Sequence, residues 1–488
     1  MTDAEFLAWL KSPSALRCAL VEAVASVEGV ETTVYMSNLG YVTAPTDTPA
    51  STCYHPAIAT GMEITERLSL DGTPSLSFGD IELFNVDGER DTWLDDIWAN
   101  REIRVYIGDM QWAREDFRLV FDGITEDIGT RNRDRLNLKV RDKSQRLNTP
   151  LTETKLGGAT ANAERLKPLC FGEVHNIEPL LADPALLKFQ VHQGAIERVI
   201  ETRDNGVVVA TTNTLAAGTY VLNQAPVGQI TNSVQGDKPT TYGNTIAGLV
   251  RRIATAYGAD PLDDATEIDD ANFDAFDAAN TQPVGVYLSD RANVLAVCQL
   301  LAGSLGASVV MTALGKLRLV KIELPPPGTP TEVNDANMKE HSLEVAERLP
   351  VQAAVKLAYC QNYTVQANLQ TGIPAEHKDL YLQPWLFANA ADSAVAAAYR
   401  ISEAPVAQET CLQVTADAQA EAVRRLALRG VPRTIYSYKA FAELMLEELG
   451  GAQTITHYRF GMAEGVTGQI VGLVKNWLTG TVTVEVLV

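Results

Sequence analysis

The sequence has few of the residue patterns from which metal and redox sites are built. Its six cysteines are far apart and form no CxxC pair, and none of its six histidines lies in an HExxH motif. A zinc or iron–sulfur site is therefore unsupported, although ligands distant in the sequence can converge in space. The pattern favours buried, reduced thiols in a protein made in a cytoplasm. The residues are Cys18, Cys53, Cys170, Cys298, Cys360 and Cys411, with His55, His175, His192, His341, His377 and His457.

The motifs of common hydrolases are missing as well. Ser304 in "LAGSLGA" lacks the G-x-S-x-G spacing and falls within a predicted helix, whereas a nucleophile elbow needs a strand-to-helix turn. A glycosidase needs two carboxylates across a cleft, and with 61 acids the sequence neither identifies nor excludes such a pair. No aromatic-rich segment lies beside a candidate, which disfavours this class. We therefore predict no catalytic residue, no cofactor-binding residue and no metal ligand.

Basic residues are also scarce, with 40 Lys and Arg against 61 Asp and Glu and a net charge of −21. This balance argues against binding nucleic acid through a basic face. The opening "MTDAEFLAWLKSPSALRC" is acidic and has no long apolar region, so it is not expected to be a signal peptide. No apolar run approaches the ~18 residues of a membrane-spanning helix, and no transmembrane segment is expected.

The clearest pattern that is present is alternation typical of β-strands. Between Arg101 and Arg141, apolar and polar residues alternate in three runs, with Trp112 in the loop between the first two. Period-two alternation predicts an antiparallel sheet with one face on a core and one face in water. The apolar positions are Ile103, Val105, Ile107, Phe117, Leu119, Phe121, Leu136, Leu138 and Val140.

The chain of 488 residues suggests three or four domains at about 150 residues each. We predict a mainly β, multidomain protein with α+β parts. Its predicted divisions are an N-terminal β region (1–155), a peripheral β domain (156–240), an α/β domain (241–330) and a C-terminal β domain (331–488).

Turn and cap signals place several elements within these divisions. The "DNG" at 204–206 predicts a hairpin. One helix is predicted over 244–257, stopped by Gly258, and a second over 289–305, capped by Ser289 or Asp290 and stopped by Gly306. A hairpin is expected over 307–322, followed by an extended linker in "LPPPGTP".

Three further elements are expected near the ends of the chain. Phe6, Trp9 and Leu10 suggest a short amphipathic helix within residues 1–12. Another helix is predicted over 416–428. The chain closes on a strand, because four valines alternate with polar residues over 481–488. The valines are Val482, Val484, Val486 and Val488.

Two local clusters leave alternatives open. The run 263–277 carries seven acids and no base, which is compatible with calcium binding, but the EF-hand order is absent and a solvated face or loop is favoured. Trp93, Trp98 and Trp112 lie near one another in the sequence. We interpret them as anchors of a β core rather than as a ligand platform.

The order of segments resembles that of phage tail hub proteins of long, non-contractile tails. The similar segments begin with "DIELFNVDGERDTWLDDIWANREIRVYIGDMQW" and "FRLVFDGITEDI", and include "TVYMSNLGYVT", "KPLCFGEVHNIEPLL", "FQVHQGAIERVIETRDNG" and the closing "GQIVGLVKNWLTGTVTVEVLV". The resemblance covers nearly the whole chain. The matching positions in its first part are Asn85, Asp87, Gly88, Trp98, Gly108, Trp112, Phe117 and Gly123.

The resemblance implies a homotrimer in which each protomer carries two tube-like β-barrels, one near each end of the chain, with the middle domains peripheral. Six barrels would continue a six-fold tail tube and present three-fold symmetry to a fibre. Some such hubs hold an iron–sulfur cluster through clustered cysteines, from which this chain departs.

The implied partners are the tail tube or distal tail protein above, and the central fibre or receptor-binding tip proteins below. A tape-measure protein could occupy the lumen, and an acidic lumen would not retain passing DNA. The implied place is the tail tip of a virion assembled in a host cytoplasm. The alternatives are a tail-associated cell-wall hydrolase and a receptor-binding tail protein.

Overall fold

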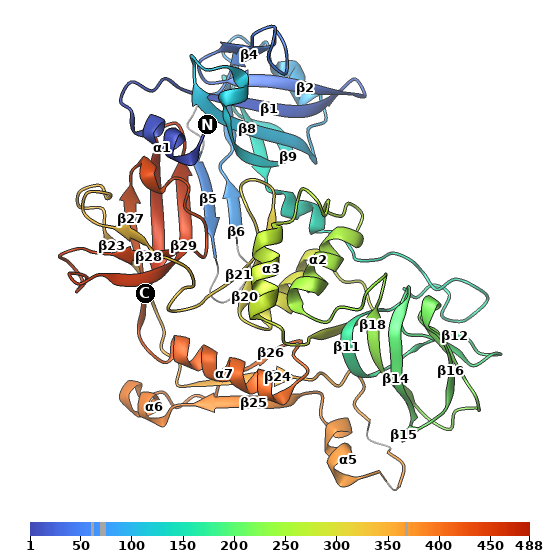
Figure 1. Ribbon diagram of the computed structural model, residues 1–488. Coiled ribbons are helices and arrows are strands. Elements are labelled where there is room, and N and C mark those ends of the chain that lie inside the picture. The colour runs from blue at the N-terminus through green and yellow to red at the C-terminus, as the bar shows by residue number, and fades with distance from the viewer. Residues whose placement is uncertain (60–62, 69–74, 367–368, 372) are drawn as a thin grey trace. The chain divides into compact units, whose positions relative to one another are not determined.

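The computed structural model describes residues 1–59, 63–68, 75–366, 369–371 and 373–488, with only the backbone described at 75–78, 375–377 and 379. It is mainly β, as predicted (Figure 1). Contacts divide the chain into two compact units. The first contains Met1–Gln145, Val310–Leu349 and Arg433–Val488, and the second contains Arg146–Val309 and Pro350–Pro432. The division into four domains stays a prediction.

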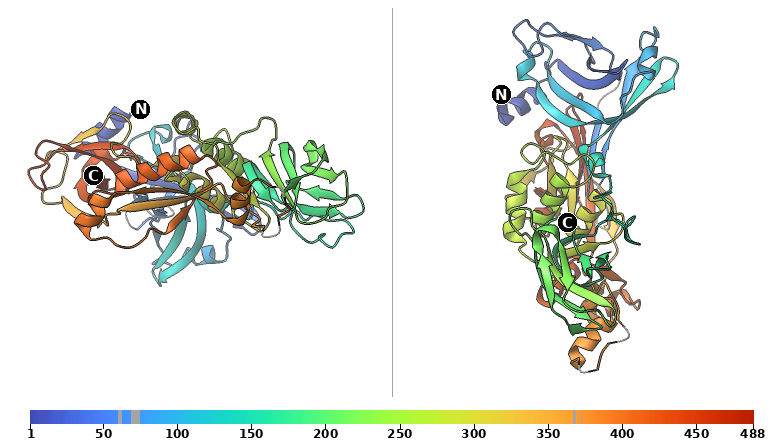
Figure 2. Two further views of the ribbon diagram at one scale, coloured as in Figure 1. Left: turned by 90° about the horizontal axis from the view of Figure 1, so that it is seen from below. Right: turned by 90° about the vertical axis from the view of Figure 1, so that its right-hand side faces the viewer.

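The N-terminal part of the first unit is an eight-stranded sheet, antiparallel except where β2 pairs with β4. Its blue and cyan strands curve strongly in Figure 2. The predicted N-terminal helix is present as α1 (Asp3–Lys11), and short 3-10 turns lie at Asp91–Leu94, Arg114–Asp116 and Lys143–Leu147. In spatial order the strands are β3 (Tyr41–Val42), β4 (Cys53–Pro56), β2 (Val30–Ser37), β1 (Arg17–Val27), β8 (Arg101–Asp109), β9 (Arg118–Asn132), β10 (Arg135–Arg141) and β7 (Ile81–Phe84).

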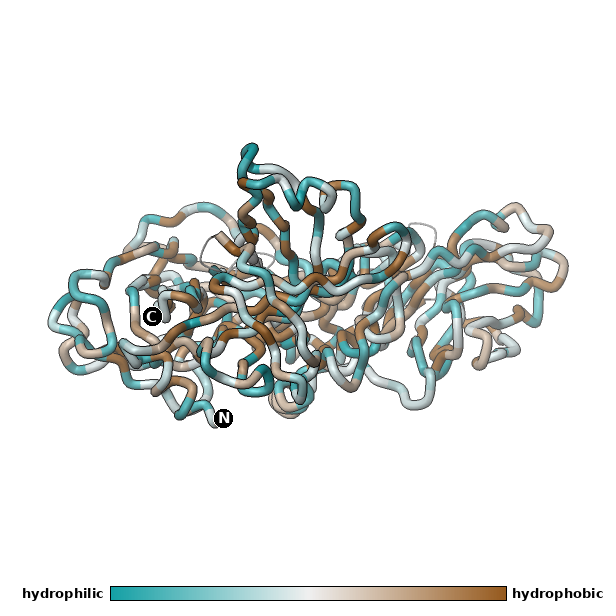
Figure 3. The backbone as a smooth tube through the Cα atoms, turned by 90° about the horizontal axis from the view of Figure 1, so that it is seen from above, coloured by the Kyte–Doolittle hydropathy of each residue, from teal (hydrophilic) through white to brown (hydrophobic). Residues whose placement is uncertain are grey.

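The predicted alternation holds in β8 and β10 and fails in part of β9. All three predicted apolar positions are buried in both β8 and β10. In β9, a bulge pairs Val105 with Phe121 and Tyr106 with Leu119. The extra residue, Val120, is buried beside Phe121, whereas Leu119 is only partly buried. A bulge inserts one residue and breaks the period of two, which sequence alternation does not reveal. In Figure 3, hydrophilic (teal) and hydrophobic (brown) residues alternate along much of the backbone trace.

The C-terminal part of the first unit is a second sheet, with a hairpin strand pair before it and a 3-10 turn at Ala442–Leu444. The predicted hairpin over 307–322 is present as β20 (Ala307–Met311) and β21 (Leu317–Lys321). In spatial order the second sheet contains β22 (Thr331–Val333), β28 (Ala452–Ile455), β29 (Val466–Asn476), β30 (Thr481–Leu487), β27 (Arg433–Ala440) and β23 (Glu344–Leu349).

Two early strands belong to this second sheet rather than to the first. β5 (Glu63–Arg67) pairs antiparallel with β29, from Arg67 opposite Gly472 to Glu63 opposite Asn476. β6 (Ser75–Phe78) pairs in turn with β5. Chain segments about 400 positions apart are thereby joined in one unit, and no local sequence signal indicates this pairing.

The paired strands leave both sheets open as ordered paths among the described residues, but in each sheet one short segment contacts strands on both sides of the path. After β4, Ile58 bridges Leu83 of β7, with Ala59 donating to the Glu82 carbonyl at 2.8 Å. In the second sheet, Met338 bridges Ala440 of β27, while the preceding β22 pairs with β28. The segment from β4 to Ala59 thus contacts β2 and β7, and the segment from β22 through β23 contacts β28 and β27, the second and fifth strands of their path.

The second unit contains three sheets and six α-helices among its described residues, with a 3-10 turn at Leu215–Ala217. The five-stranded sheet has the order β15 (Val207–Val208), β14 (Ile196–Asp204), β18 (Ile230–Asp237), β11 (Leu169–Ile177), β19 (Gly285–Leu288). The four-stranded sheet has the order β12 (Leu180–Asp183), β13 (Lys188–Gln190), β17 (Thr219–Leu222), β16 (Thr211–Thr214). The three-stranded sheet has the order β25 (Leu386–Ala391), β24 (Ala354–Tyr359), β26 (Ala407–Glu409). The helices are α2 (Ile246–Ala256), α3 (Asp270–Ala279), α4 (Val294–Gly303), α5 (Ala375–Leu382), α6 (Ser393–Tyr399) and α7 (Thr415–Arg429).

The local signals in this unit are confirmed with one correction. The hairpin turn has Asn205 and Gly206 at positive φ, as a type I′ turn requires, and α2 and α7 occupy their predicted ranges. The helix predicted from Ser289 begins later, as α4, and its cap is Asn293, which accepts from the Ala296 amide at 3.2 Å. The preceding backbone cannot turn into a helix because Asn293 bridges Pro150. Of the described helices, none has the length and apolarity needed to cross a membrane.

The closing strand is confirmed as β30, which lies between β27 and β29 rather than at an edge. Val482, Val484 and Val486 are each at most 1% exposed, and Val488 is half-buried. β30 is therefore a central strand of the second sheet, and its valines lie in the core.

Deleting Thr481–Val488 should unfold or aggregate the second sheet. Burial of each valine stabilises by about 1.5 kcal/mol or more, so the losses approach the whole stability of a typical domain. The deletion would also leave β27 and β29 with unpaired edges. Thermal unfolding and the soluble fraction measure the effect.

Deleting Met1–Glu5 is the matched control, because it removes exposed residues and one ion pair, Arg118 to Asp3 at 2.6 Å, while Phe6 and Leu10 stay in the core. This second deletion should be far milder. A C-terminal deletion that melts like the parent would contradict the central role of β30.

Candidate functional site

The residues that carry the family resemblance lie in the first sheet, where they shape its turns. Asn85 is buried, accepts from the Arg90 amide at 3.0 Å and donates to Asp91 at 2.7 Å. Gly88 has φ +73°, a conformation that favours glycine. These contacts hold the loop that follows β7, and they leave no free group for chemistry at Asn85.

Two glycines allow close approach inside the sheet. A side chain at Gly108 would lie 2.7 Å from the Phe117 ring, and one at Gly123 would lie 2.5 Å from the Arg141 carbonyl as well as against Phe121. Glycine at these positions is required for packing. Phe117 itself is buried in a cluster that contains Tyr41 and Tyr54.

The three tryptophans at 93, 98 and 112 form two ring contacts: Trp93 packs on Trp98, and Trp112 packs on Trp9. Trp98 is 1% exposed and donates to the Trp93 carbonyl at 2.8 Å. Trp112 is half-buried and lies 4.5 Å from the ring of Trp9 on α1, which donates to Asp109 at 2.9 Å. Trp98 is a core anchor, as the sequence predicted, whereas Trp93 and Trp112 are only partly buried.

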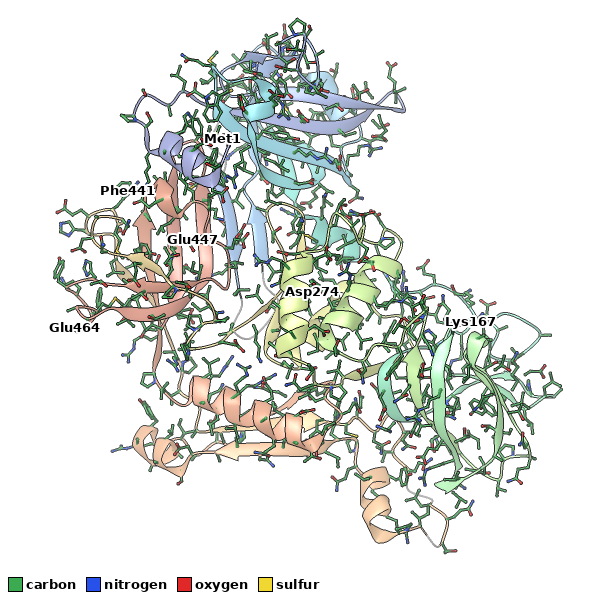
Figure 4. The ribbon with its side chains drawn as sticks, in the orientation of Figure 1. Met1, Lys167, Asp274, Phe441, Glu447 and Glu464 are labelled. Atoms are coloured by element: carbon green, nitrogen blue, oxygen red, sulfur yellow. The ribbon has the colours of Figure 1, made fainter. Side chains whose placement is uncertain are left out.

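The acidic run 263–277 is used for capping and ion pairing. Glu267 binds Arg146 at 2.8 Å, and Asp264 and Asp270 bind Arg251 at 2.6 and 2.8 Å. Asp269 caps α3. Part of the run is helical, and the exposed Asp274, labelled in Figure 4, lies on that helix. The run itself contains no basic residue, and the arginines that pair with it come from other parts of the chain.

The described cysteines and histidines lie apart from one another or in contacts with other kinds of residue. Within the described parts of the chain, no group of three His, Cys, Asp or Glu could hold an ion. All six cysteines are free, and Cys53 is exposed, which corrects the expectation that all are buried. Burial raises the pKa of Cys298 to about 12, so this thiol is a poor nucleophile.

The most site-like titratable cluster is enclosed in the second unit. His192 is fully buried, its Nδ1 accepts from the Cys170 amide at 3.0 Å, and its Nε2 lies 3.3 Å from Asp237. Arg252 and Tyr257 also bind Asp237, at 2.7 and 3.0 Å. Burial raises the pKa of Asp237, but hydrogen bonds from His192 and Arg252 outweigh it and leave that pKa lowered. His192 and Asp237 are buried, whereas the Arg252 side chain is 32% exposed.

A second buried network ties the first sheet together, and sequence reasoning missed it. Arg114 is 7% exposed, donates to Glu22 at 2.7 Å and to the Tyr54 hydroxyl at 3.1 Å, and lies 3.7 Å over the ring of Tyr106. Tyr54 also donates to Glu22. Burial raises the pKa of Tyr54, and hydrogen bonding to Glu22 adds to this. The residues come from three segments, so only the fold brings them together.

Arg114→Met should destabilise the first unit by about 3–5 kcal/mol, because it leaves the Glu22 carboxylate largely buried without its partner. The double variant Arg114→Met with Glu22→Gln should recover much of this loss. Thermal or urea unfolding of both variants, with Glu22→Gln alone completing the cycle, measures the coupling. Additive effects would show that the two side chains do not interact.

No known family model matches the sequence, and no curated protein matches it. Among solved structures, the chain is similar to the tail protein from Neisseria meningitidis MC58, with 10% identity, 96% of each chain covered and a TM-score of 0.41. It is also similar to the 43 kDa tail protein of prophage MuSo2 from Shewanella oneidensis, with 11% identity, 96% of this chain and 98% of that chain covered, and a TM-score of 0.43. A third likeness, to a chain in the virion of a native gene transfer agent particle, has 14% identity, covers 70% of this chain and 90% of that chain, and has a TM-score of 0.40. At identities and TM-scores this low, the likenesses carry no argument on what this chain does.

Proposed function

We propose that this chain is a non-enzymatic structural protein of a phage tail tip, in which three copies form a hub around a central channel. The hub continues the tail tube and adapts its six-fold symmetry to the three-fold symmetry of a fibre. The proposal rests on the sequence resemblance and on the construction of the first unit. It agrees with the tail and virion structures named above, although those likenesses carry no argument by themselves.

The observation that carries the proposal is the linkage of strand ends in both sheets of the first unit. The segment from β4 through Ala59 contacts β2 and β7 of the first sheet, and the segment from β22 through β23 contacts β28 and β27 of the second. A sheet whose ends are linked exposes little free edge, which a tube wall requires. This supports two barrel-like walls in each protomer, hence six in a trimer.

The same proposal assigns places to the four divisions of the chain and to the neighbouring tail proteins. The divisions 156–240 and 241–330 would be peripheral, and those at 1–155 and 331–488 would each supply a barrel. The neighbours would be the tail tube or distal tail protein above and the fibre or tip proteins below, with a tape-measure protein in the lumen. The net charge of −21 disfavours retention of DNA in the channel.

The assembled form should be a homotrimer with a central channel. A particle reconstruction, or mass measurement of a purified tail tip, gives the copy number. The isolated protein can stay monomeric until a neighbour nucleates the ring, so the measurement belongs on the assembled tip. A single copy or a six-copy ring in the virion would contradict the predicted trimer.

Purified protein should show no activity on host peptidoglycan or polysaccharide in zymograms, because no catalytic constellation is found at recognisable spacing. A known muralytic enzyme on the same gel controls for substrate quality. Clearing that disappears when one specific acid or histidine is replaced would overturn the non-enzymatic assignment and favour a tail-associated hydrolase.

A further inference from the structure

The turn between β9 and β10 is a basic point on an acidic protein. This hairpin tip, residues 130–135, reads TRNRDR, with three arginines and one acid, whereas the whole chain has a net charge of −21. Arg131 and Arg135 both pair with the carboxylate of Glu82. Arg133 is exposed and forms no ion pair with the described residues. The hairpin tip therefore presents one cation that has no partner within this part of the chain.

Hydrogen bonds hold the hairpin tip in one conformation. The Asn132 side chain accepts from the Asp134 amide at 3.0 Å, and the Asp134 carbonyl accepts from the Asn85 amide at 2.9 Å. Asn85 is itself buried in the loop after β7. Arg133 is thus carried on a fixed backbone, which lowers the entropy lost when its side chain binds a partner.

The second sheet of the same unit carries a groove of about 450 Å³ between two loops. One loop follows β22 and contributes Asp335 and Glu340, and the other lies between β28 and β29 and contributes Tyr458 and Phe460. Tyr458 is 69% exposed and Phe460 is 44% exposed. The side chains of Asp335 and Glu340 are 64% and 88% exposed. All four side chains are therefore open to a partner.

The two carboxylates of the groove have unused hydrogen-bonding capacity. Asp335 lies 3.2 Å from Nε2 of His457, and Glu340 lies 3.2 Å from Nε2 of His341. Neither carboxylate has a second partner among the described residues. Because a carboxylate offers about four acceptor sites, most of these sites are free for a donor from outside the chain.

Acidic residues outnumber basic ones in the segments that form the groove. Residues 331–348 and 456–465 together contain six acids and three bases. Glu464, labelled in Figure 4, is one of the acids. Among the bases, Arg459 lies 5.5 Å over the ring of Phe460, so the aromatic side of the groove already accepts a guanidinium. The groove therefore suits a partner that brings a further arginine.

We propose that the hairpin tip of one copy inserts into this groove of a second copy, where Arg133 binds Glu340 and stacks on Tyr458. A guanidinium suits both partners, because it binds a carboxylate bidentately and stacks on aromatic rings. The inference rests on the proposed trimer and names a contact that holds its copies together.

The positions of the two surfaces favour a contact between copies. The hairpin tip belongs to the first sheet and the groove to the second, and no hydrogen bond or ion pair joins them within the described parts of one copy. A contact between unlike surfaces is head-to-tail, and such contacts generate a ring when the rotation closes. Copies that each carry −21 repel one another at a distance. A basic tip in an acidic groove offsets this repulsion locally and sets the register of the contact.

Cross-linking in the assembled tail tip tests the contact. Arg133→Cys and Glu340→Cys are combined in the full-length chain, with the exposed Cys53 changed by Cys53→Ser, and the tips are treated with a short bismaleimide. Covalent trimers should appear on denaturing gels, because each copy is joined to the next around the ring, and either new cysteine alone should give none. Monomers alone, or dimers as the largest product, would overturn the proposal.

Charge reversal gives a second, independent measurement. Arg133→Glu should lower the yield of assembled tips about tenfold, because each of three contacts loses an exposed ion pair. Adding Glu340→Arg to the same chain should restore most of the yield. Thermal unfolding should be unchanged in both variants, since both positions are exposed. An unchanged yield with Arg133→Glu, or a loss that Glu340→Arg does not restore, would contradict the contact.

Lys139→Glu is the matched control. Lys139 is another basic residue of this hairpin with no ion pair to the described residues, but it lies within β10, away from the tip. The control should leave the yield unchanged, and an equal loss would assign the effect to net charge and overturn the contact.

The copy number in the same tips separates this inference from the proposed function. Three copies in tips that give no cross-linked trimer would overturn the contact and keep the proposed hub. A tip without three copies would overturn both.

Discussion

The pairing of β5 with β29 is the contact on which the first unit depends. It joins Glu63–Arg67 to a strand near the other end of the chain, and β30 then lies on the opposite side of β29. Closing so long a loop costs conformational entropy that grows only slowly with length. The loss is offset by a continuous backbone ladder and by the buried valines of β30. Arg17 and Phe6 add to this link, because Arg17 donates to the Leu478 carbonyl at 3.1 Å and the Phe6 ring lies 6.2 Å from that of Trp477.

Buried polar groups also stabilise the first sheet of this unit. The buried network of Glu22, Tyr54 and Arg114 connects β1, β4 and a 3-10 turn, with every charged group paired. A buried pair of this kind is weak evidence for net stability, but removal of one member is costly. Gly108 and Gly123 also stabilise this sheet, because they let aromatic rings pack against the backbone. The residues that carry the family resemblance are thus explained by packing and turn geometry, which suits a structural role.

The second unit also contains a cluster of titratable groups with buried members. Its titratable cluster around Asp237 is built on two buried side chains, His192 and Asp237, and on Arg252, which is 32% exposed. Buried polar groups that are fully hydrogen-bonded help to specify a single fold.

The sequence alone predicted the elements whose signals are local. Alternation over 135–141 and 481–488, the "DNG" turn, and the capped helix before Gly258 depend on a few neighbouring residues, and each is found where expected. Tertiary structure decided the rest. The bulge opposite Val105, the Asn293 cap imposed by the bridge to Pro150, and the pairing of the acidic run with Arg146 and Arg251 all require partners distant in the chain. The hydrogen-bonded network of Glu22, Tyr54 and Arg114 could not be predicted either, because only the fold brings its three segments together.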